Sequence, residues 1–145
     1  MDARQDAGRG AWTARERGAE DEGQPIRLLV AEDDHAWRAA LTAAVRADPR
    51  FTLLAAVADA LDAVAALALR PHLVLTDVHM PPGPDGFHVI RAAAAAGVPA
   101  VAMSSDESWR ELVRDAGGLA FVSKALHLRS LLDAVAEAHA RHHEG

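Results

Sequence analysis

The 145-residue sequence has no cysteine and no tyrosine, and aromatic residues make up only 4% of it. Without cysteine the chain can form neither a disulfide framework nor a thiolate zinc site, and it has no cysteine nucleophile. Positive charge is also scarce, because 21 acidic residues against 15 basic ones give a formal net charge of −6. A nucleic-acid-binding domain needs a basic stripe, so we do not expect direct contact with nucleic acid.

Long hydrophobic runs are absent too. No apolar run approaches membrane-spanning length, and the N-terminus has charges where a signal peptide would have its apolar core. We therefore expect a cytoplasmic protein that does not contact a membrane. Residues 1–24 show no periodic apolar pattern and are rich in Gly, Arg, Asp and Glu, which predicts a disordered tail. Its single aromatic residue, Trp12, is either incidental or part of a short docking element.

Half of the residues are hydrophobic, and the length suits one domain with a sizeable core. From Pro25 onward, apolar strand-like runs alternate with alanine-rich stretches of helical periodicity. The strands are expected at 26–31, 51–57, 73–76, 100–103 and 120–123. The helices are expected at 35–47, 59–69, 87–96, 107–116 and 128–141, with a loop at 81–86. Five such units predict a parallel sheet covered on both faces, in a domain spanning 25–141 with a short tail at 142–145.

Polar residues follow four of the expected strands at the point where each apolar run ends. They are the acidic run from Glu32 to Asp34, then Asp77, Ser104 and Lys124. Because the carboxyl ends of parallel strands meet at one edge of a sheet, we expect these side chains to lie close together. The acids could hold a hard cation, while the hydroxyl and the ammonium could hold an anion. A phosphoryl group is the substrate that such a site suits.

This pattern resembles the receiver domain of two-component response regulators, in particular the stand-alone receivers of the chemotaxis-Y type. The resemblance covers about 26–139 and rests on the four polar strand ends in their order and spacing. The loop from Met80 to Gly86 and the turn at Gly117 and Gly118 add to it. It implies an α/β, flavodoxin-like (βα)5 fold, a doubly wound parallel sheet with strand order 2-1-3-4-5.

The same resemblance implies roles for individual residues. Asp77 would be the phospho-acceptor, whose carboxylate forms an acyl phosphate. Lys124 and Ser104 would bind the phosphoryl oxygens. A Mg²⁺ ion would be held by Asp33 and Asp77 directly and by Glu32 through water.

Further positions follow from the resemblance. The backbone carbonyl of His79 would supply another Mg²⁺ ligand, and the side chains of His79 and Asp106 would flank the path of attacking water. Phosphorylation would draw the Ser104 hydroxyl inward and let Phe121, where the family often has tyrosine, rotate inward as a switch. Ordinary core packing of Phe121 is the alternative interpretation.

Two residue assignments and the role of one surface residue each have an alternative. The acidic pair is taken as Glu32 and Asp33, with Asp34 as N-cap of the helix at 35–47, although a shift by one residue is conceivable. Ser104 is preferred over Ser105, which a one-residue slip would bring into its place. Trp109 is either core or an anchor on the partner-binding face formed by 107–116, 120–123 and 128–141, which a second copy could also use.

Some departures from the family pattern concern the output half. Ala125 follows Lys124 where many receivers have proline, the loop at 81–86 has one extra residue, and the helix at 107–116 looks short. His139 and His143 have the i, i+4 spacing of a helical metal pair, but a basic helix end is the preferred interpretation.

Three functions are compatible with the sequence. The first is a stand-alone receiver that takes a phosphoryl group from a histidine kinase or phosphotransfer protein and is not an enzyme acting on other substrates. The second is an aspartyl-phosphate phosphatase, which would need an acid where His79 stands. The third is a receiver-like interaction domain that no longer switches.

Overall fold

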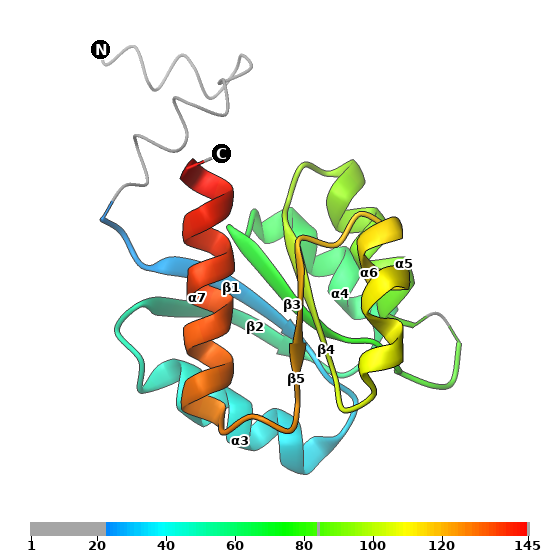
Figure 1. Ribbon diagram of the computed structural model, residues 1–145, viewed down its shortest axis with the longest axis horizontal. Helices are drawn as coiled ribbons and strands as arrows, with labels where there is room; N and C mark the ends of the chain where they lie inside the picture. Colours follow the sequence, from blue (N-terminus) through cyan, green and yellow to red (C-terminus); the bar gives the residue numbers. More distant parts are fainter. Residues whose placement is uncertain (1–22, 84, 145) are drawn as a thin grey trace.

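A five-stranded parallel sheet lies at the centre of the protein (Figure 1). The computed structural model describes residues 23–83 and 85–144, so the predicted tail, including Trp12, falls outside the described residues except for Gly23 and Gln24. The strands are β1 (Ile26–Ala31), β2 (Phe51–Val57), β3 (Leu73–Asp77), β4 (Ala100–Ser104) and β5 (Ala120–Ser123). Their order is β2-β1-β3-β4-β5, and every neighbouring pair is parallel. The predicted flavodoxin-like fold is thereby confirmed.

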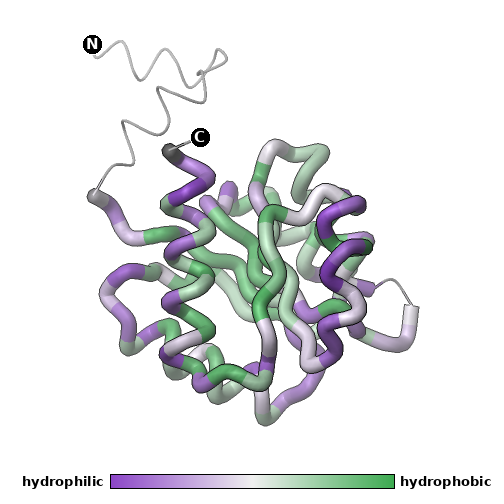
Figure 2. Tube along the Cα trace, viewed as in Figure 1, coloured by the Kyte–Doolittle hydropathy of each residue, from purple (hydrophilic) through white to green (hydrophobic). Residues whose placement is uncertain are grey.

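Helices cover both faces of the sheet. One face carries α3 (His35–Arg46) and α7 (Leu128–Glu144), and the other carries α4 (Ala60–Ala66), α5 (Gly86–Ala95) and α6 (Arg110–Asp115). Successive side chains of a strand point to opposite faces, so β1 contributes Leu28 and Val30 to one core cluster and Leu29 and Ala31 to the other. Figure 2 shows the hydrophobic strands at the centre and hydrophilic residues along the outer helices. Within the described ranges, no helix has the length and hydropathy needed to cross a membrane.

Aspartates fix the starts of several helices. The Asp34 carboxylate accepts hydrogen bonds from the backbone N–H groups of Ala36 (2.9 Å) and Trp37 (3.3 Å) at the start of α3. Asp59 and Asp85 cap α4 and α5 in the same way. A side-chain acceptor at this position satisfies amide groups that have no partner within the helix. The prediction that Asp34 caps the first helix is confirmed.

Two of the predicted helices, at 35–47 and 87–96, agree with the structure to within one residue at either end, whereas the other three differ more. The stretch at 59–69 divides into α4 and a 3₁₀ turn (Leu67–Leu69), and the stretch at 107–116 begins with a 3₁₀ turn (Glu107–Trp109) before the short α6. Residues 142–144, predicted to be a tail, instead continue α7. An i, i+4 ion pair between Glu137 and Arg141 (2.9 Å) and the basic residues of the last turn stabilise this end of the helix.

The start of α5 lies directly against the end of β3. A Cβ atom at Gly86 would collide with the backbone carbonyl oxygen of Asp77, so only glycine permits this approach. The Gly86 N–H donates a hydrogen bond to the carbonyl of Val78 (3.0 Å), which ties the helix to the strand end. The loop before α5 therefore holds the backbone of Asp77 in place.

Candidate functional site

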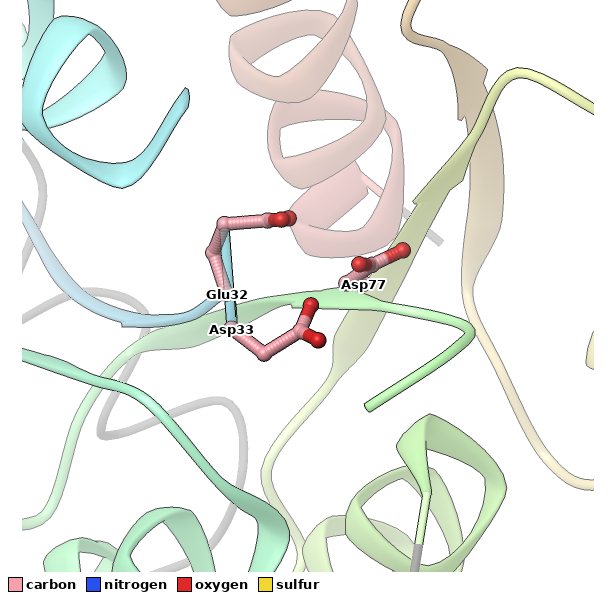
Figure 3. A group of neighbouring side chains, drawn as sticks. All are labelled: Glu32, Asp33 and Asp77. Carbon is pink, nitrogen blue, oxygen red and sulfur yellow. The ribbon is translucent and has the colours of Figure 1, made fainter. Parts of the chain in front are cut away.

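Three carboxylates converge at the carboxyl edge of the sheet (Figure 3). Glu32 and Asp33 follow β1, and Asp77 ends the neighbouring strand β3. One carboxylate oxygen from each residue lies within 4.8 Å of the other two. Glu32 and Asp77 are buried, while Asp33 is exposed to solvent. The strand order thus brings together the acids that the sequence separates by more than forty positions.

Lys124 reaches the acids from the edge strand β5. It follows β5, and its side chain reaches past the end of β4 so that Nζ lies 2.9 Å from Glu32 Oε2 and 3.2 Å from Asp77 Oδ2. The backbone N–H of Lys124 donates to the carbonyl of Ser104 (3.0 Å), which fixes where the side chain starts. One ammonium therefore bridges two buried carboxylates. Removing any one of these three groups would leave a buried charge without compensation.

Burial dominates the protonation of this group. It raises the pKa of Glu32 to about 7, with the nearby Asp77 charge acting in the same direction and Lys124 opposing it. Burial likewise raises the pKa of Asp77, although Lys124 favours its charged form. Burial alone would lower the pKa of Lys124, but its contacts with the two carboxylates outweigh burial and raise it. One ammonium thus does not compensate the negative charge that two buried carboxylates would carry, and each carboxyl group holds its proton more tightly than in water.

This excess of negative charge fits a second cation. The buried Glu32 Oε2 lies 2.9 Å from Lys124 Nζ, and no other donor among the described residues reaches this oxygen. Oxygen donors on two adjacent strand ends are the kind that Mg²⁺ prefers. The residues present therefore suit that ion.

The structure separates the roles of the three consecutive acids. The Asp34 carboxylate binds the first amide groups of α3, so it is not part of the cluster. The Asp34 backbone N–H instead donates to Glu32 Oε1 (3.2 Å) and orients that side chain. Figure 3 shows Glu32 and Asp33 extending from the end of β1 toward Asp77. The pair facing Asp77 is thus Glu32 and Asp33.

The two serines after β4 differ in the same way. Ser104 is buried, and its Oγ accepts a hydrogen bond from the backbone N–H of Asp106 (3.0 Å), whereas Ser105 is exposed. An accepting hydroxyl keeps its own proton free to donate to a further group. Ser104 also lies at the end of the strand between β3 and β5. Of the two hydroxyls, Ser104 is the one inside the edge of the sheet.

Two residues of α3 contact the site, although no motif in the sequence predicted them. The Lys124 Nζ lies 5.6 Å from the centre of the Trp37 ring, over its face. Arg38 donates from one guanidinium nitrogen to the backbone carbonyls of Glu32 (2.9 Å) and Asp33 (3.5 Å). Their positions three and four residues after the N-cap place both on the first turn of α3. Helical spacing could have located them there, but not the direction of their side chains.

A cluster of three rings, from His79, Phe87 and Trp109, begins two residues after Asp77. The exposed His79 ring meets the Trp109 ring edge-on at 4.9 Å, and Trp109 also lies 5.7 Å from Phe87. Trp109 is half-buried and packs against the core cluster on the α5 face, which favours core packing over the alternative of an exposed anchor. Phe121 is buried too, at 7% exposure, and the Arg110 guanidinium lies 4.8 Å from its ring centre.

Comparisons with known proteins agree with this geometry. Residues 28–136 match the family model of the response regulator receiver domain. The chain is 40% identical over 86 residues to protein-glutamate methylesterase/protein-glutamine glutaminase 2 of Anaeromyxobacter dehalogenans, a match that covers 57% of this chain and 25% of that protein. It is 30% identical over 128 residues to the transcriptional regulatory protein PdtaR of Mycobacterium tuberculosis, covering 86% of this chain and 62% of PdtaR. The matches thus span a quarter of one relative and less than two thirds of the other.

Solved structures show the same fold at low sequence identity. The chemotaxis response regulator CheY4 of Vibrio cholerae has a TM-score of 0.71 and 16% identity, with 79% of this chain and 99% of that chain covered. A DNA-binding response regulator of the LuxR family from Staphylococcus aureus has a TM-score of 0.72 and 21% identity, with 79% and 98% covered.

Proposed function

This chain belongs to the response regulator receiver domain family of two-component systems, a family of signalling modules, and on that premise we propose that Asp77 accepts a phosphoryl group in a Mg²⁺-dependent reaction. One observation carries the proposal. The carboxylate oxygens of Glu32, Asp33 and Asp77 lie within 4.8 Å of one another, and Lys124 bridges two of these residues. An ammonium beside a carboxylate nucleophile, with acids that suit Mg²⁺, is the equipment that phosphoryl transfer to an aspartate needs.

The Mg²⁺ ion would be held by the three carboxylates and by the backbone carbonyl of His79. When bound, it supplies positive charge that reduces the repulsion between the incoming phosphoryl group and the carboxylates. The His79 backbone lies beside the nucleophile, since its N–H donates to Asp77 Oδ1 at 3.4 Å.

The protein residues then divide the work. One Asp77 oxygen attacks phosphorus, the bond from phosphorus to the donor histidine nitrogen breaks, and an acyl phosphate remains on Asp77. Lys124, already 3.2 Å from Asp77 Oδ2, would neutralise one phosphoryl oxygen as a point charge. The Ser104 hydroxyl would donate a hydrogen bond to a second phosphoryl oxygen.

The donor and the output are proteins in this proposal. A histidine kinase or phosphotransfer protein would supply the phosphoryl group, which places the reaction in the cytoplasm. The signal would leave through the face formed by α6, β5 and α7, either to a downstream protein or to a second copy of the chain.

We also propose that the chain acts as a stand-alone receiver. An immunoblot of native cells tests this: a band at 15.3 kDa supports it and a longer product overturns it.

Turnover of other substrates is not part of the proposal. An aspartyl-phosphate phosphatase would use a general acid two residues after the nucleophile, and His79 at that position packs its ring against Trp109. A receiver that no longer switches is the second candidate function. It is favoured by Phe121, whose ring is already buried, with the Arg110 guanidinium 4.8 Å from its centre.

The experiment is incubation of the full chain with Mg²⁺ and acetyl phosphate, read by intact mass. We expect a mass gain of one phosphoryl group that disappears without Mg²⁺ and in Asp77→Asn. The matched control is Asp34→Asn, because asparagine caps a helix as well as aspartate does and Asp34 lies outside the cluster. A titration with beryllofluoride, a stable mimic of the phosphoryl group, detects site formation if the adduct is lost during handling. No adduct and no beryllofluoride binding in the wild type would refute the proposal.

A further inference from the structure

We propose that His139 and His143 form a second metal site, for a divalent transition metal such as Cu²⁺ or Ni²⁺, at the C-terminal end of α7. The two residues are one helical turn apart, and their Nε2 atoms lie 2.9 Å from each other. Their ring centres are 4.2 Å apart with the planes inclined at 56°. Both coordinating nitrogens therefore point at the same small volume beside the helix.

The separation of the two nitrogens is compatible with a divalent transition metal. Imidazole nitrogens bind divalent transition metals at about 2.0–2.1 Å. Two nitrogens 2.9 Å apart would then subtend about 90° at the ion, whereas a tetrahedral angle needs a separation of about 3.3–3.4 Å at that bond length. An angle of about 90° is the cis angle of square-planar, tetragonal and octahedral centres. Nitrogen ligands in such geometry are typical of Cu²⁺ and Ni²⁺ rather than of structural zinc.

The protonation of the pair is compatible with metal binding. At 2.9 Å one ring donates its Nε2–H to the Nε2 of the other. When the donor ring takes the tautomer with its proton on Nδ1, both Nε2 lone pairs face the ion. No net proton is released by neutral rings in this step. Imidazole binds metals only when neutral, so the affinity should fall in acid.

The neighbouring histidines are not ligands in this arrangement. The Arg27 backbone N–H donates to His72 Nδ1 (3.1 Å), so a neutral His72 ring has its proton on Nε2 and packs beside His139 at 6.4 Å without offering a lone pair to the ion. His142 is adjacent to His143 in sequence, and adjacent residues on a helix point in different directions. Among the described residues, His139 and His143 would be the two protein ligands of this site.

The second site is chemically and spatially separate from the first. His72 directly precedes β3 and Asp77 ends it, so the pair next to His72 lies at the amino edge of the sheet and the acids lie at the carboxyl edge (Figure 1). The nearby Glu137 carboxylate is paired with Arg141 at 2.9 Å. With nitrogen donors in place of oxygens, the pair should not bind Mg²⁺.

The test is calorimetric titration of the full chain with CuCl₂ or NiCl₂ in excess MgCl₂, together with electron paramagnetic resonance of the Cu²⁺ form. The variant His139→Gln/His143→Gln keeps a good helix former at both positions, and circular dichroism checks its fold. We expect one tight Cu²⁺ per chain with nitrogen hyperfine coupling, and an affinity at least about tenfold weaker in the variant, since chelation by two linked ligands is lost.

The matched control is His142→Gln, which removes a histidine from the same turn and should leave affinity and spectrum unchanged. Equal Cu²⁺ affinity in the wild type and in His139→Gln/His143→Gln would overturn the proposal. A loss of binding in His142→Gln as large as in the double variant would also overturn it, because the ligands would then be other than the pair.

Discussion

Replacement of Glu32 by glutamine should stabilise the metal-free protein above pH 7. The Glu32 side chain has no exposure to solvent, and burial raises its pKa from 4.5 to about 7. A raised carboxyl pKa means that the folded state binds the proton more tightly than the unfolded state. The wild-type protein therefore has the full contribution of Glu32 below pH 4.5 and loses it as the pH rises to 7.

The magnitude follows from the same interval. Each pH unit corresponds to 1.36 kcal/mol, so ionised Glu32 lowers the free energy of unfolding by about 2–4 kcal/mol above pH 7. Glutamine has nearly the same shape without the charge, and its amide oxygen can still accept the hydrogen bond from the Asp34 N–H in place of Oε1. The variant should thus match the wild type at the acid end and exceed it by about 2–4 kcal/mol at the alkaline end.

The assay is urea unfolding at a series of pH values in the presence of a chelator, followed by circular dichroism. Asp34→Asn is the control, since Asp34 is exposed and remains a helix cap, and its difference from the wild type should not follow the Glu32 curve. Two results would refute the reasoning. One is a Glu32→Gln variant that is less stable than the wild type above pH 7, and the other is a difference that does not change with pH.

Three further predictions concern the same edge of the sheet. Lys124→Met should destabilise the metal-free protein above pH 7 by about 3–5 kcal/mol, because Glu32 and Asp77 lose their shared counter-charge; urea unfolding measures this, and added Mg²⁺ should restore part of the loss. Mg²⁺ affinity should rise with pH up to about 7, since the proton on Glu32 competes with the metal; a titration followed by tryptophan fluorescence checks it, and a flat profile would contradict it. Gly86→Ala should destabilise by more than about 2 kcal/mol through its collision with the Asp77 backbone, whereas Gly97→Ala meets no atom within 4 Å and should cost only the strain of its left-handed backbone conformation; urea unfolding measures both.

The strands could be predicted closely from the sequence because two sequence signals coincide at their ends. β1, β2 and β5 begin and end where the apolar runs do, and a polar residue or a turn follows each. Their parallel arrangement then brings Asp77 and Lys124 to the same edge of the sheet. Strand order is a property of the fold, so it came from the family resemblance rather than from any local pattern.

The stretch at 107–116 depends on a contact between residues far apart in the sequence, which local patterns do not predict. Its first turn is a 3₁₀ turn, held by the Asp106 carboxylate, which accepts from the Ser108 N–H (2.9 Å), and by Trp109 packed against His79. The cap has a local signal, but the tryptophan contact joins residues thirty positions apart and appears only once the strands are in place. The two contacts of α3 with the site, from Trp37 and Arg38, were missed for the same reason.

The most direct measurement locates the phosphoryl group on the chain. Borohydride reduction of the protein after treatment with acetyl phosphate and Mg²⁺ converts an aspartyl phosphate to homoserine, and peptide mass spectrometry then identifies the position. We predict homoserine at position 77 alone, with none in a sample prepared without Mg²⁺. Reduction at another carboxylate, or an adduct that survives at full yield in Asp77→Asn, would contradict the central claim.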